Sequence, residues 1–236
     1  MIRLPTPRVK GRTYDTTGRR VRAAAHRARI VQAARDRFLA DGYAATTVAA
    51  VAADAEVSVD TIYKGFGGKL GLLEAAWWRA LEGRGEGPAE QRADATARQG
   101  DARTMIATWA RLSGEVAGEG SRLFALIRSL AVVDPAVGDL YQRIEKSRTD
   151  RMAHNAQLLA ATGALRPGIS VDQARDIMLA VSGHLPEPLL DRAGWPAPDY
   201  VDLVNRILQA ALLATPCKHR PDPLGLRPGP ICSIRM

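Results

Sequence analysis

The residues most suggestive of chemistry are three glycines and a lysine in the stretch GFGGK at positions 65–69. Glycine-rich loops before a lysine can cradle phosphate groups through backbone N–H donors, as in nucleotide-binding P-loops. The P-loop spacing fails here, because Tyr63 stands where the first glycine should be and Leu70 follows Lys69. The dinucleotide pattern G-x-G-x-x-G fails because it requires glycine at position 70. The stretch therefore needs another explanation.

Other reactive side chains are too dispersed to predict an enzyme. The two cysteines, Cys217 and Cys232, lie in a proline-rich C-terminal segment, and the four histidines are scattered along the chain. This distribution lacks the spacing of a disulfide framework, a metal cluster or a catalytic nucleophile, and no paired carboxylates form an acid–base motif. We therefore expect no enzymatic activity, no metal and no cofactor.

The positive charge is concentrated near the N-terminus. The 236-residue chain has 33 Lys and Arg against 25 Asp and Glu, a formal net charge of +8. Residues 1–29 hold nine basic residues and one acid, so they carry the whole excess. A basic segment of this kind favours a polyanionic partner, most simply nucleic acid. The alternative is that it only aids solubility.

Length and composition are those of a soluble globular chain with one larger and one smaller domain. Hydrophobic residues make up 46% of the sequence. No uncharged apolar run reaches the ~18 residues of a membrane helix, and the N-terminus lacks the apolar core of a secretion signal. We expect a cytoplasmic protein without a membrane partner.

The spacing of apolar residues predicts helices at the N-terminal end. Ile30, Ala34 and Phe38 recur at four-residue intervals in a first helix over 23–41, which Gly42 ends. This periodicity defines one buried face. The later apolar patterns are helical as well, so the expected fold is all-α.

Two short helices follow, joined by about four residues, as in a helix-turn-helix. Thr46 and Thr47 are candidate N-caps of the first, and Ser58 of the second. The glycines of GFGGK end the second helix, and Lys69 begins the next. The outer face of the second short helix has small or hydrogen-bonding side chains that suit a DNA major groove. A plain helical hairpin has the same pattern.

An ordered series of landmarks runs without a gap from Arg29 to Trp77: the Ile30/Ala34/Phe38 face, Gly42-Tyr43, Thr46-Thr47-Val48, Val51-Ala52, Val57-Ser58, Thr61-Ile62-Tyr63, Phe66, Lys69 and Leu72-Leu73. This stretch resembles the DNA-binding domain of the TetR family of bacterial transcriptional regulators. The resemblance implies an all-α fold, with an N-terminal helix-turn-helix three-helix DNA-binding domain and a larger C-terminal helical ligand-binding and dimerisation domain. The family usually has glycine where Glu56 stands.

The resemblance implies that Thr47, Tyr63 and Lys69 hold DNA phosphates. Outward residues of the third helix would face base edges or the adjoining backbone, although Asp60 can instead help to cap its own helix. Arginines ahead of the first helix are placed to reach a neighbouring minor groove. The predicted DNA-binding set is Arg19, Arg20, Arg22, Thr46, Thr47, Ser58, Val59, Asp60, Thr61, Tyr63, Lys64 and Lys69.

The C-terminal region divides into a linker and a helical domain. Residues 83–100 are rich in Gly, Ala and charge, which predicts a mobile linker. Helical patterns follow over about 101–118, 121–133, 136–162, 171–184 and 198–214, separated by Gly and Pro. We therefore expect four units: a basic flexible arm at 1–22, the DNA-binding domain at 23–69, a ligand-binding and dimerisation domain at 70–215, and a Pro-rich disordered tail at 216–236.

The resemblance also implies a homodimer, in which the last two long helices pair with their copies as a four-helix bundle. Their surplus of apolar residues fits this arrangement: Met178, Leu179, Val181, Val204, Ile207, Leu208, Ala211 and Leu212. The remaining helices would enclose a small-molecule effector, with candidate ligand-binding residues Met105, Trp109, Phe124, Arg128, Tyr141, Met152 and His154. Arg128 could pair with an anionic ligand group or form a surface ion pair.

These features predict a ligand-responsive, sequence-specific transcriptional regulator that binds double-stranded DNA. The expected form is a repressor that a small molecule releases from an inverted-repeat operator. The alternative is a low-specificity DNA-coating protein that acts through the basic arm. A third hypothesis, an enzyme or carrier that kept the helical ligand domain, lacks a catalytic motif.

Overall fold

The computed structural model describes residues 16–83, 88–98 and 101–214, with side chains from residue 21 onward except that of Glu119. Within these residues the chain is helical apart from turns and one isolated β-bridge between Leu165 and Leu213. The prediction of an all-α fold is confirmed. In chain order the helices are α1 Thr16–Ala40, α2 Gly42–Ala45, α3 Val48–Asp54, α4 Val59–Phe66, α5 Lys69–Leu81, α6 Ala89–Ala97, α7 Ala102–Leu130, α8 Pro135–Ala161, α9 Val171–His184, the π-helical segment η1 Glu187–Arg192, and α10 Ala197–Leu212.

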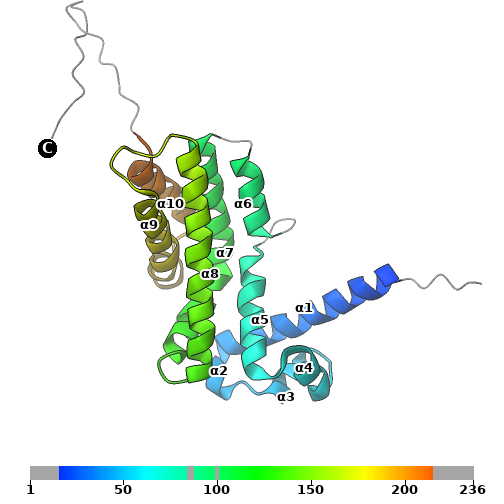
Figure 1. The fold of residues 1–236 in the computed structure, drawn as a ribbon. Coiled ribbons are helices and arrows are strands. Elements are labelled where there is room, and N and C mark those ends of the chain that lie inside the picture. The colour runs from blue at the N-terminus through cyan, green and yellow to red at the C-terminus, as the bar shows by residue number, and fades with distance from the viewer. Residues whose placement is uncertain (1–15, 84–87, 99–100, 215–236) are drawn as a thin grey trace, which may run out of the picture.

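The helices form a small base and a taller body (Figure 1). The base contains α1 to α4, and α5 rises from it toward α6. The body is built on α7 and α8, which run side by side, with α9 and α10 along one flank and α6 on the other. The N-terminal half of α1 projects from the base past α4. The prediction of a smaller N-terminal and a larger C-terminal helical part is confirmed.

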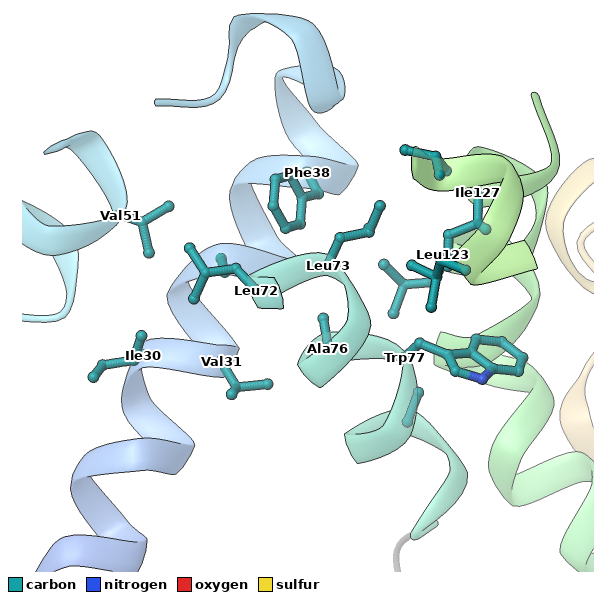
Figure 2. Close-up of a cluster of buried hydrophobic side chains, with 14 of the residues drawn as sticks. Ile30, Val31, Phe38, Val51, Leu72, Leu73, Ala76, Trp77, Leu123 and Ile127 are labelled. Carbon is teal, nitrogen blue, oxygen red and sulfur yellow. The ribbon is translucent and has the colours of Figure 1, made fainter. Parts of the chain in front are cut away.

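The base is held by the face that the sequence predicts for α1. Ile30, Ala34 and Phe38 are buried, and they meet Val51 of α3 and the apolar side of α5 (Figure 2). The helix itself begins at Thr16 rather than at residue 23. The last residues of the predicted flexible arm are therefore helical, and residues 1–15 lie outside the described residues.

Buried apolar side chains form two clusters that share α7 and α8. The first, which we call the base cluster, joins the base to the adjoining ends of α7 and α8 through residues such as Leu123, Ile127 and Val137. The second fills the space between α6, the N-terminal half of α7, the C-terminal half of α8, α9 and α10. Because both clusters pack on the same two helices, α7 and α8 join the base to the body.

The linker expected over residues 83–100 is wrong for the segment that forms α6. Ala89 and Ala93 lie four positions apart and are both buried, so they seat α6 against α7. Arg92 reaches Glu115 of α7 with a 2.7 Å ion pair. Alanine has the highest helix propensity, so an Ala- and charge-rich segment can form an amphipathic helix as readily as a linker.

The break expected near residues 118–121 is also wrong, because α7 is one continuous helix. One of its glycines serves packing. A Cβ added at Gly114 would lie 2.4 Å from Cγ2 of Val201, so the absence of a side chain allows α10 to approach α7 closely. A Cβ added at Gly120 would make only an ordinary contact with the Trp77 ring, at 3.9 Å. A glycine inside a helix is costly in isolation but is retained where another element needs the space.

Five of the eight apolar residues assigned to a dimer face belong instead to the protein's own core. These are Met178, Val181, Val204, Leu208 and Leu212, all 9% exposed or less. They pack α9 and α10 against α7 and α8. Only Leu179, Ile207 and Ala211 remain half-buried. The apolar surplus therefore reflects mainly the interior of one chain.

Candidate nucleic-acid interface and internal cavity

Helices α3 and α4 form the predicted helix-turn-helix, and the chain between them is tied to α3. The backbone N–H of Val57 donates to the Ala52 carbonyl oxygen at 2.9 Å, and the Val57 side chain packs on the base cluster. Ile62 of α4 is fully buried in the same cluster. Helices this short are not stable alone, so the cluster fixes the direction in which α4 faces outward.

Glu56 lies in this turn in the left-handed backbone region, with φ of 54°. It is exposed, and no other non-glycine residue of the described chain has a positive φ. A side chain in this conformation costs about 1–2 kcal/mol relative to glycine. The turn therefore needs the conformation that glycine adopts most easily.

Thr47 and Ser58 cap α3 and α4, as the sequence predicts. Oγ1 of Thr47 accepts the Ala50 N–H at 3.0 Å, and Oγ of Ser58 accepts the Thr61 N–H at 3.1 Å. Both capping residues are exposed at the N-termini of their helices. Backbone N–H groups at such an end favour an anion, so both caps remain candidates for phosphate contact.

Thr46 does not share this position. Its side chain is 2% exposed, and its hydroxyl donates to the Gly42 carbonyl oxygen at 2.8 Å. A buried hydroxyl with an internal partner is not available to DNA. We therefore correct the expectation that Thr46 contacts DNA and treat it as a structural residue that fixes the end of α2.

The outer face of α4 carries exposed side chains of the predicted set. Val59 is 40% and Tyr63 is 55% exposed. Lys64 and Asp60 form an ion pair at 2.7 Å across one turn. A surface pair of this kind is worth only about 0.3–0.5 kcal/mol, so Lys64 can exchange Asp60 for a phosphate at little cost. Asp60 lies in the first turn, where its charge suits the helix dipole, but Ser58 makes the N-cap hydrogen bond.

The glycines after α4 produce the turn into α5. Gly67 has φ of 74°, and its N–H donates to the Tyr63 carbonyl oxygen at 2.9 Å, closing the helix. Gly68 follows with φ of 120°. Gly65, in contrast, is still inside α4. The prediction that glycines end this helix is confirmed for Gly67 and Gly68 and wrong for Gly65.

Lys69 begins α5, as predicted, and turns back toward α2. Its Nζ donates to the Ala44 carbonyl oxygen at 3.1 Å and lies 4.4 Å from the centroid of the Tyr43 ring. Burial and, secondarily, the negative charge of Asp134 raise the pKa of the Tyr43 phenol. An ammonium group has three donors, so the bond to Ala44 leaves others that can face a phosphate.

Arg27 anchors the far end of α4, a role that charge counting did not reveal. Its guanidinium donates to the Gly65 carbonyl oxygen at 3.1 Å and lies 4.2 Å from the centroid of the Phe66 ring. A signal was present in the sequence, because Arg27 precedes Ile30 and Val31 by three and four positions and so shares their face of α1. This contact ties α1 to α4.

The predicted arm residues lie on the projecting half of α1. Arg22 is exposed there. Arg19 and Arg20 belong to the same helix, although their side chains lie outside the described part. Figure 1 shows this half of α1 extending away from the body on the side of α4. The backbone of all three arginines is therefore part of a helix rather than a free chain.

A second ion pair ties α1 to α3. Arg37 donates two hydrogen bonds to the Asp54 carboxylate, at 2.5 and 2.9 Å. These hydrogen bonds lower the pKa of Asp54 below its usual 3.8, against the opposing effect of partial burial. The same bonds raise the pKa of the Arg37 guanidinium. Bidentate pairing of this kind adds geometric definition to the helix-turn-helix.

A cavity of about 200 Å³ lies where the two apolar clusters meet, lined by residues of α5 to α10 and of η1. Three of the predicted ligand residues line it: Trp109, Phe124 and Met152. Most of its wall is apolar, with aromatic and methionine side chains among the lining residues. Concave sites with apolar walls and a few polar groups are typical of small-molecule binding.

The other predicted ligand residues lie elsewhere. Met105 is buried in the second cluster. Tyr141 lies on α8, and its ring centroid is 5.8 Å from that of Phe124 on α7. His154 is exposed, with Nε2 3.3 Å from Asp94. None of these three is among the cavity's lining residues.

Arg128 also falls outside the cavity, because its guanidinium pairs with Glu187 at 2.7 Å. Hydrogen bonds from Arg192 and from Arg128 lower the pKa of the Glu187 carboxyl. The surface ion pair, one of the two alternatives for Arg128, is the arrangement that the structure contains. Arg128 joins η1 to α7 at the rim.

Trp77 and Asn155 line the cavity but were not in the predicted set. Trp77 belongs to the apolar face of α5, and its spacing alone does not distinguish a core residue from a lining residue. Asn155 had a usable signal, because it lies three positions after Met152 and four before Leu159. A polar residue on such a buried face usually has a specific partner.

The described residues contain no group of His, Cys, Asp and Glu side chains arranged to hold a metal ion. No helix in that part of the chain is long and apolar enough to cross a membrane. Cys217, Cys232 and the predicted tail at 216–236 lie outside the described residues.

Comparison with known proteins agrees with this geometry. Residues 30–76 match the family model of bacterial regulatory proteins, tetR family. The match covers α3 and α4 with the parts of α1 and α5 that support them. No curated protein matches the sequence significantly.

Solved structures share the fold across nearly their whole length. A protein named as a TetR-family transcriptional regulator from Rhodococcus sp. is 22% identical with a TM-score of 0.62, covering 80% of this chain and 99% of its own. A transcriptional regulator from Saccharomonospora viridis, solved in complex with choline, is 18% identical with a TM-score of 0.62, covering 81% and 100%. SmeT in a complex with triclosan is 21% identical with a TM-score of 0.62, covering 80% and 92%. At these identities the likeness concerns the fold.

Proposed function

We propose that this chain, whose residues 30–76 match the family model of bacterial regulatory proteins, tetR family, is a sequence-specific transcriptional regulator controlled by a small molecule. The observation that carries the proposal is the presentation of α4. Its apolar side is locked into the base by Ile62, while Val59, Tyr63 and Lys64 are exposed on the other side. A rigidly mounted helix with polar outer residues suits a major groove.

We assign the contacts with DNA by position. Thr47, Tyr63 and Lys69 lie at or near helix ends and hold phosphates. Val59, Thr61 and Lys64 face base edges or adjoining phosphates, with Asp60 as a weak internal partner of Lys64. Arg19, Arg20 and Arg22 extend the contact along α1. The DNA-reading unit comprises residues 23–69 with the basic segment 1–22 before it.

The body, residues 70–215, is proposed to bind the effector and to form a homodimer. A two-fold dimer reads two half-sites of an inverted repeat about 34 Å apart, one turn of the duplex. An effector that prefers a different spacing of the two α4 helices lowers operator affinity by the same coupling factor. The choline and triclosan complexes of two proteins with this fold support a ligand-binding body. We propose repression released by the effector as the mode of action.

Selection of genomic fragments by the purified protein tests this function. A sequence-specific regulator recovers a defined inverted repeat, and it binds that site at least ~10³-fold more tightly than random DNA at ~150 mM salt. Equal affinity for both DNAs would instead support a low-specificity DNA-coating protein that acts through its basic segment. The effector is then sought as a compound that lowers affinity for the recovered operator.

Lys64→Ala tests the role of α4 and has a matched control. Lys64 pairs with Asp60 across one turn of α4, and Lys146 pairs with Asp150 in the same way on α8, both at 2.7 Å. We expect Lys64→Ala to weaken operator binding and to reduce the slope of log K against log[salt] by about 1. Lys146→Ala removes the same charge and the same kind of pair, and should leave both quantities unchanged. Equal effects of the two variants would exclude α4 from the interface.

A further inference from the structure

Three buried polar atoms in the cavity wall lack a hydrogen-bond partner within the described chain: Nε1 of Trp77, Nε1 of Trp109 and Oδ1 of Asn155. Their residues are 4%, 7% and 5% exposed. Buried polar groups are nearly always paired, because an unpaired one forfeits its hydration without compensation. The cavity therefore offers two donors and one acceptor to whatever occupies it.

Most of the charges around the cavity, in contrast, are already neutralised. Four ionisable residues line it, and three of them have a partner of opposite charge within 2.8 Å: Arg148 with Glu145, Arg151 with Asp94, and Glu187 with Arg128. The fourth, Glu90, is exposed. An anionic ligand would have to break one of these pairs or be buried without a counterion, and both are costly. A cationic ligand would meet only the exposed Glu90, whose charge is screened by solvent.

The unpaired atoms fall at two ends of the cavity. The Trp77 ring lies 5.6 Å from Phe124, near the base, and Figure 2 shows it pointing from α5 toward α7. Phe124 on α7 faces Tyr141 on α8 at 5.8 Å, and the two helices run in opposite directions through the turn at 131–134. Asn155 follows Tyr141 by fourteen positions on α8, and Trp109 precedes Phe124 by fifteen positions on α7. Because the two helices are antiparallel, Trp109 and Asn155 both lie toward the end of the cavity that is farther from the base.

The cavity follows one face of α7 between these ends. Its lining residues on that helix recur at three- and four-residue spacing from Trp109 to Phe124, which spans about 22 Å at the rise of an α-helix. The shape of the cavity therefore favours an elongated apolar ligand rather than a compact one.

The geometry points to a neutral, elongated, mostly apolar ligand that carries a hydroxyl-type group at the Trp109–Asn155 end of the cavity. A hydroxyl can accept from the Trp109 N–H and donate to Oδ1 of Asn155 at once, which satisfies both unpaired atoms. A carboxylate offers no donor, and an ammonium offers no acceptor. This inference rests on the proposed effector response, since it names the chemical class of the effector.

Calorimetric titration of the full chain, without DNA, tests the ligand class. The probes are 1-octanol, octyl methyl ether, octanoate and octylammonium at pH 7, which share a chain and differ in the end group. We expect 1-octanol to bind about tenfold more tightly than the other three, because only it satisfies both atoms, and tenfold is the upper range for one neutral hydrogen bond. Tighter binding of octanoate or octylammonium, or no binding of 1-octanol, would overturn the inference.

Two indole variants locate the hydroxyl. Trp109→Phe and Trp77→Phe each remove one N–H and keep an aromatic ring in the same cavity. We expect Trp109→Phe to lose most of the preference for 1-octanol over octyl methyl ether, and Trp77→Phe to retain it. Asn155→Leu should also lose the preference. If only Trp77→Phe loses the preference for 1-octanol, the hydroxyl does not lie at the Trp109–Asn155 end of the cavity.

The outcome is independent of the DNA measurements. The titrations decide the ligand class, whether or not an operator is found. If 1-octanol binds as expected but leaves affinity for a recovered operator unchanged, the proposed effector control fails while the inference about the cavity stands.

Discussion

Glu56 places a side chain where the turn of the helix-turn-helix requires a left-handed backbone, with φ of 54°. Glycine adopts this conformation without the steric penalty of a Cβ. We therefore expect Glu56→Gly to raise the free energy of unfolding by about 1 kcal/mol, even though the change removes a side chain. Urea unfolding monitored by circular dichroism measures the difference.

The control for this prediction is Glu56→Ala. It removes the same carboxylate but keeps a Cβ in the left-handed region, so it should show none of the gain. If Glu56→Ala stabilises the protein as much as Glu56→Gly, the effect comes from the charge and the conformational explanation is wrong.

The role of a single residue could be predicted where it depends only on residues that are close in sequence. The caps Thr47 and Ser58 depend on the three residues that follow them, and both were correctly predicted. Thr46 looks identical to Thr47 in sequence, yet it is buried because the end of α2 folds over it. Arg27 contacts Gly65, which is 38 positions away, so no local pattern could show the pairing. A local sequence pattern carries no information about which distant residues pack together.

At the scale of elements, the junction of α4 and α5 makes two glycines behave in opposite ways. A Cβ at Gly65 would meet no atom within 4 Å, whereas one at Gly71 would lie 1.7 Å from the Phe66 carbonyl oxygen. Both residues are inside helices. We expect Gly65→Ala to stabilise the protein by up to about 1 kcal/mol through helix propensity. Gly71→Ala should destabilise it by about 2 kcal/mol or more, because backbone must move.

Thermal and urea unfolding of the two alanine variants measure these effects side by side. Each variant is the control for the other, since the chemical change is the same. Stabilisation by Gly71→Ala would show that α5 does not lie this close to the end of α4.

The ion pair between α1 and α3 predicts how the base responds to acid. The pKa of Asp54 is lowered in the folded protein, so the unfolded state binds the proton more tightly. Its contribution is fully present above the usual pKa of 3.8 and is lost as the pH falls through the lower folded value. We expect Asp54→Asn to be less stable than the wild type near pH 7, with a difference that shrinks as the pH falls below about 4. Urea midpoints across this range measure it.

Asp139→Asn is the control, because Asp139 is exposed on α8. It should leave the acid dependence of stability as it is in the wild type. If wild type and Asp54→Asn differ in stability by the same amount at every pH, the ion pair between Asp54 and Arg37 is not the source of the stability difference.

Elements were predictable where hydrophobic periodicity is strong and local stop signals agree with it. The short helices of the base and α9 follow their predicted ranges closely. The errors at α6 and in the middle of α7 share one cause. Gly and Ala were interpreted as breaks: the Ala-rich segment of α6 as part of a linker, and the glycines near residue 120 as the end of a helix. Ala93 is small because α7 packs against it, and α7 continues through residue 120. Small residues therefore have two interpretations that only tertiary structure separates.

At the scale of the molecule, α5 connects the two places where binding is proposed. Its first residue, Lys69, contacts α2 beside the DNA-facing surface, and Trp77 lines the cavity two turns later. Between them, Leu72 and Leu73 are buried in the base cluster. Because Trp77 packs on Phe124 of α7, a ligand that shifts this wall acts on the helix that supports the helix-turn-helix. A cavity residue and a residue proposed to face DNA thus lie on one helix, which gives the proposed control a direct physical path.

Dimer formation is the remaining requirement for reading an inverted repeat, and the structure narrows where to test it. Ile207 stays half-buried on α10 after the protein's own core has taken Val204 and Leu208. If α10 pairs with its copy, Ile207→Lys buries an unpaired charge in the interface, which costs about 3 kcal/mol or more and corresponds to at least ~100-fold weaker association. Ala197→Lys places the same charge at the exposed start of α10 and is the matched control. Light scattering after size exclusion should show Ile207→Lys as a monomer with weakened operator binding and Ala197→Lys as a dimer, whereas an unchanged mass for both variants would move the interface away from this face of α10.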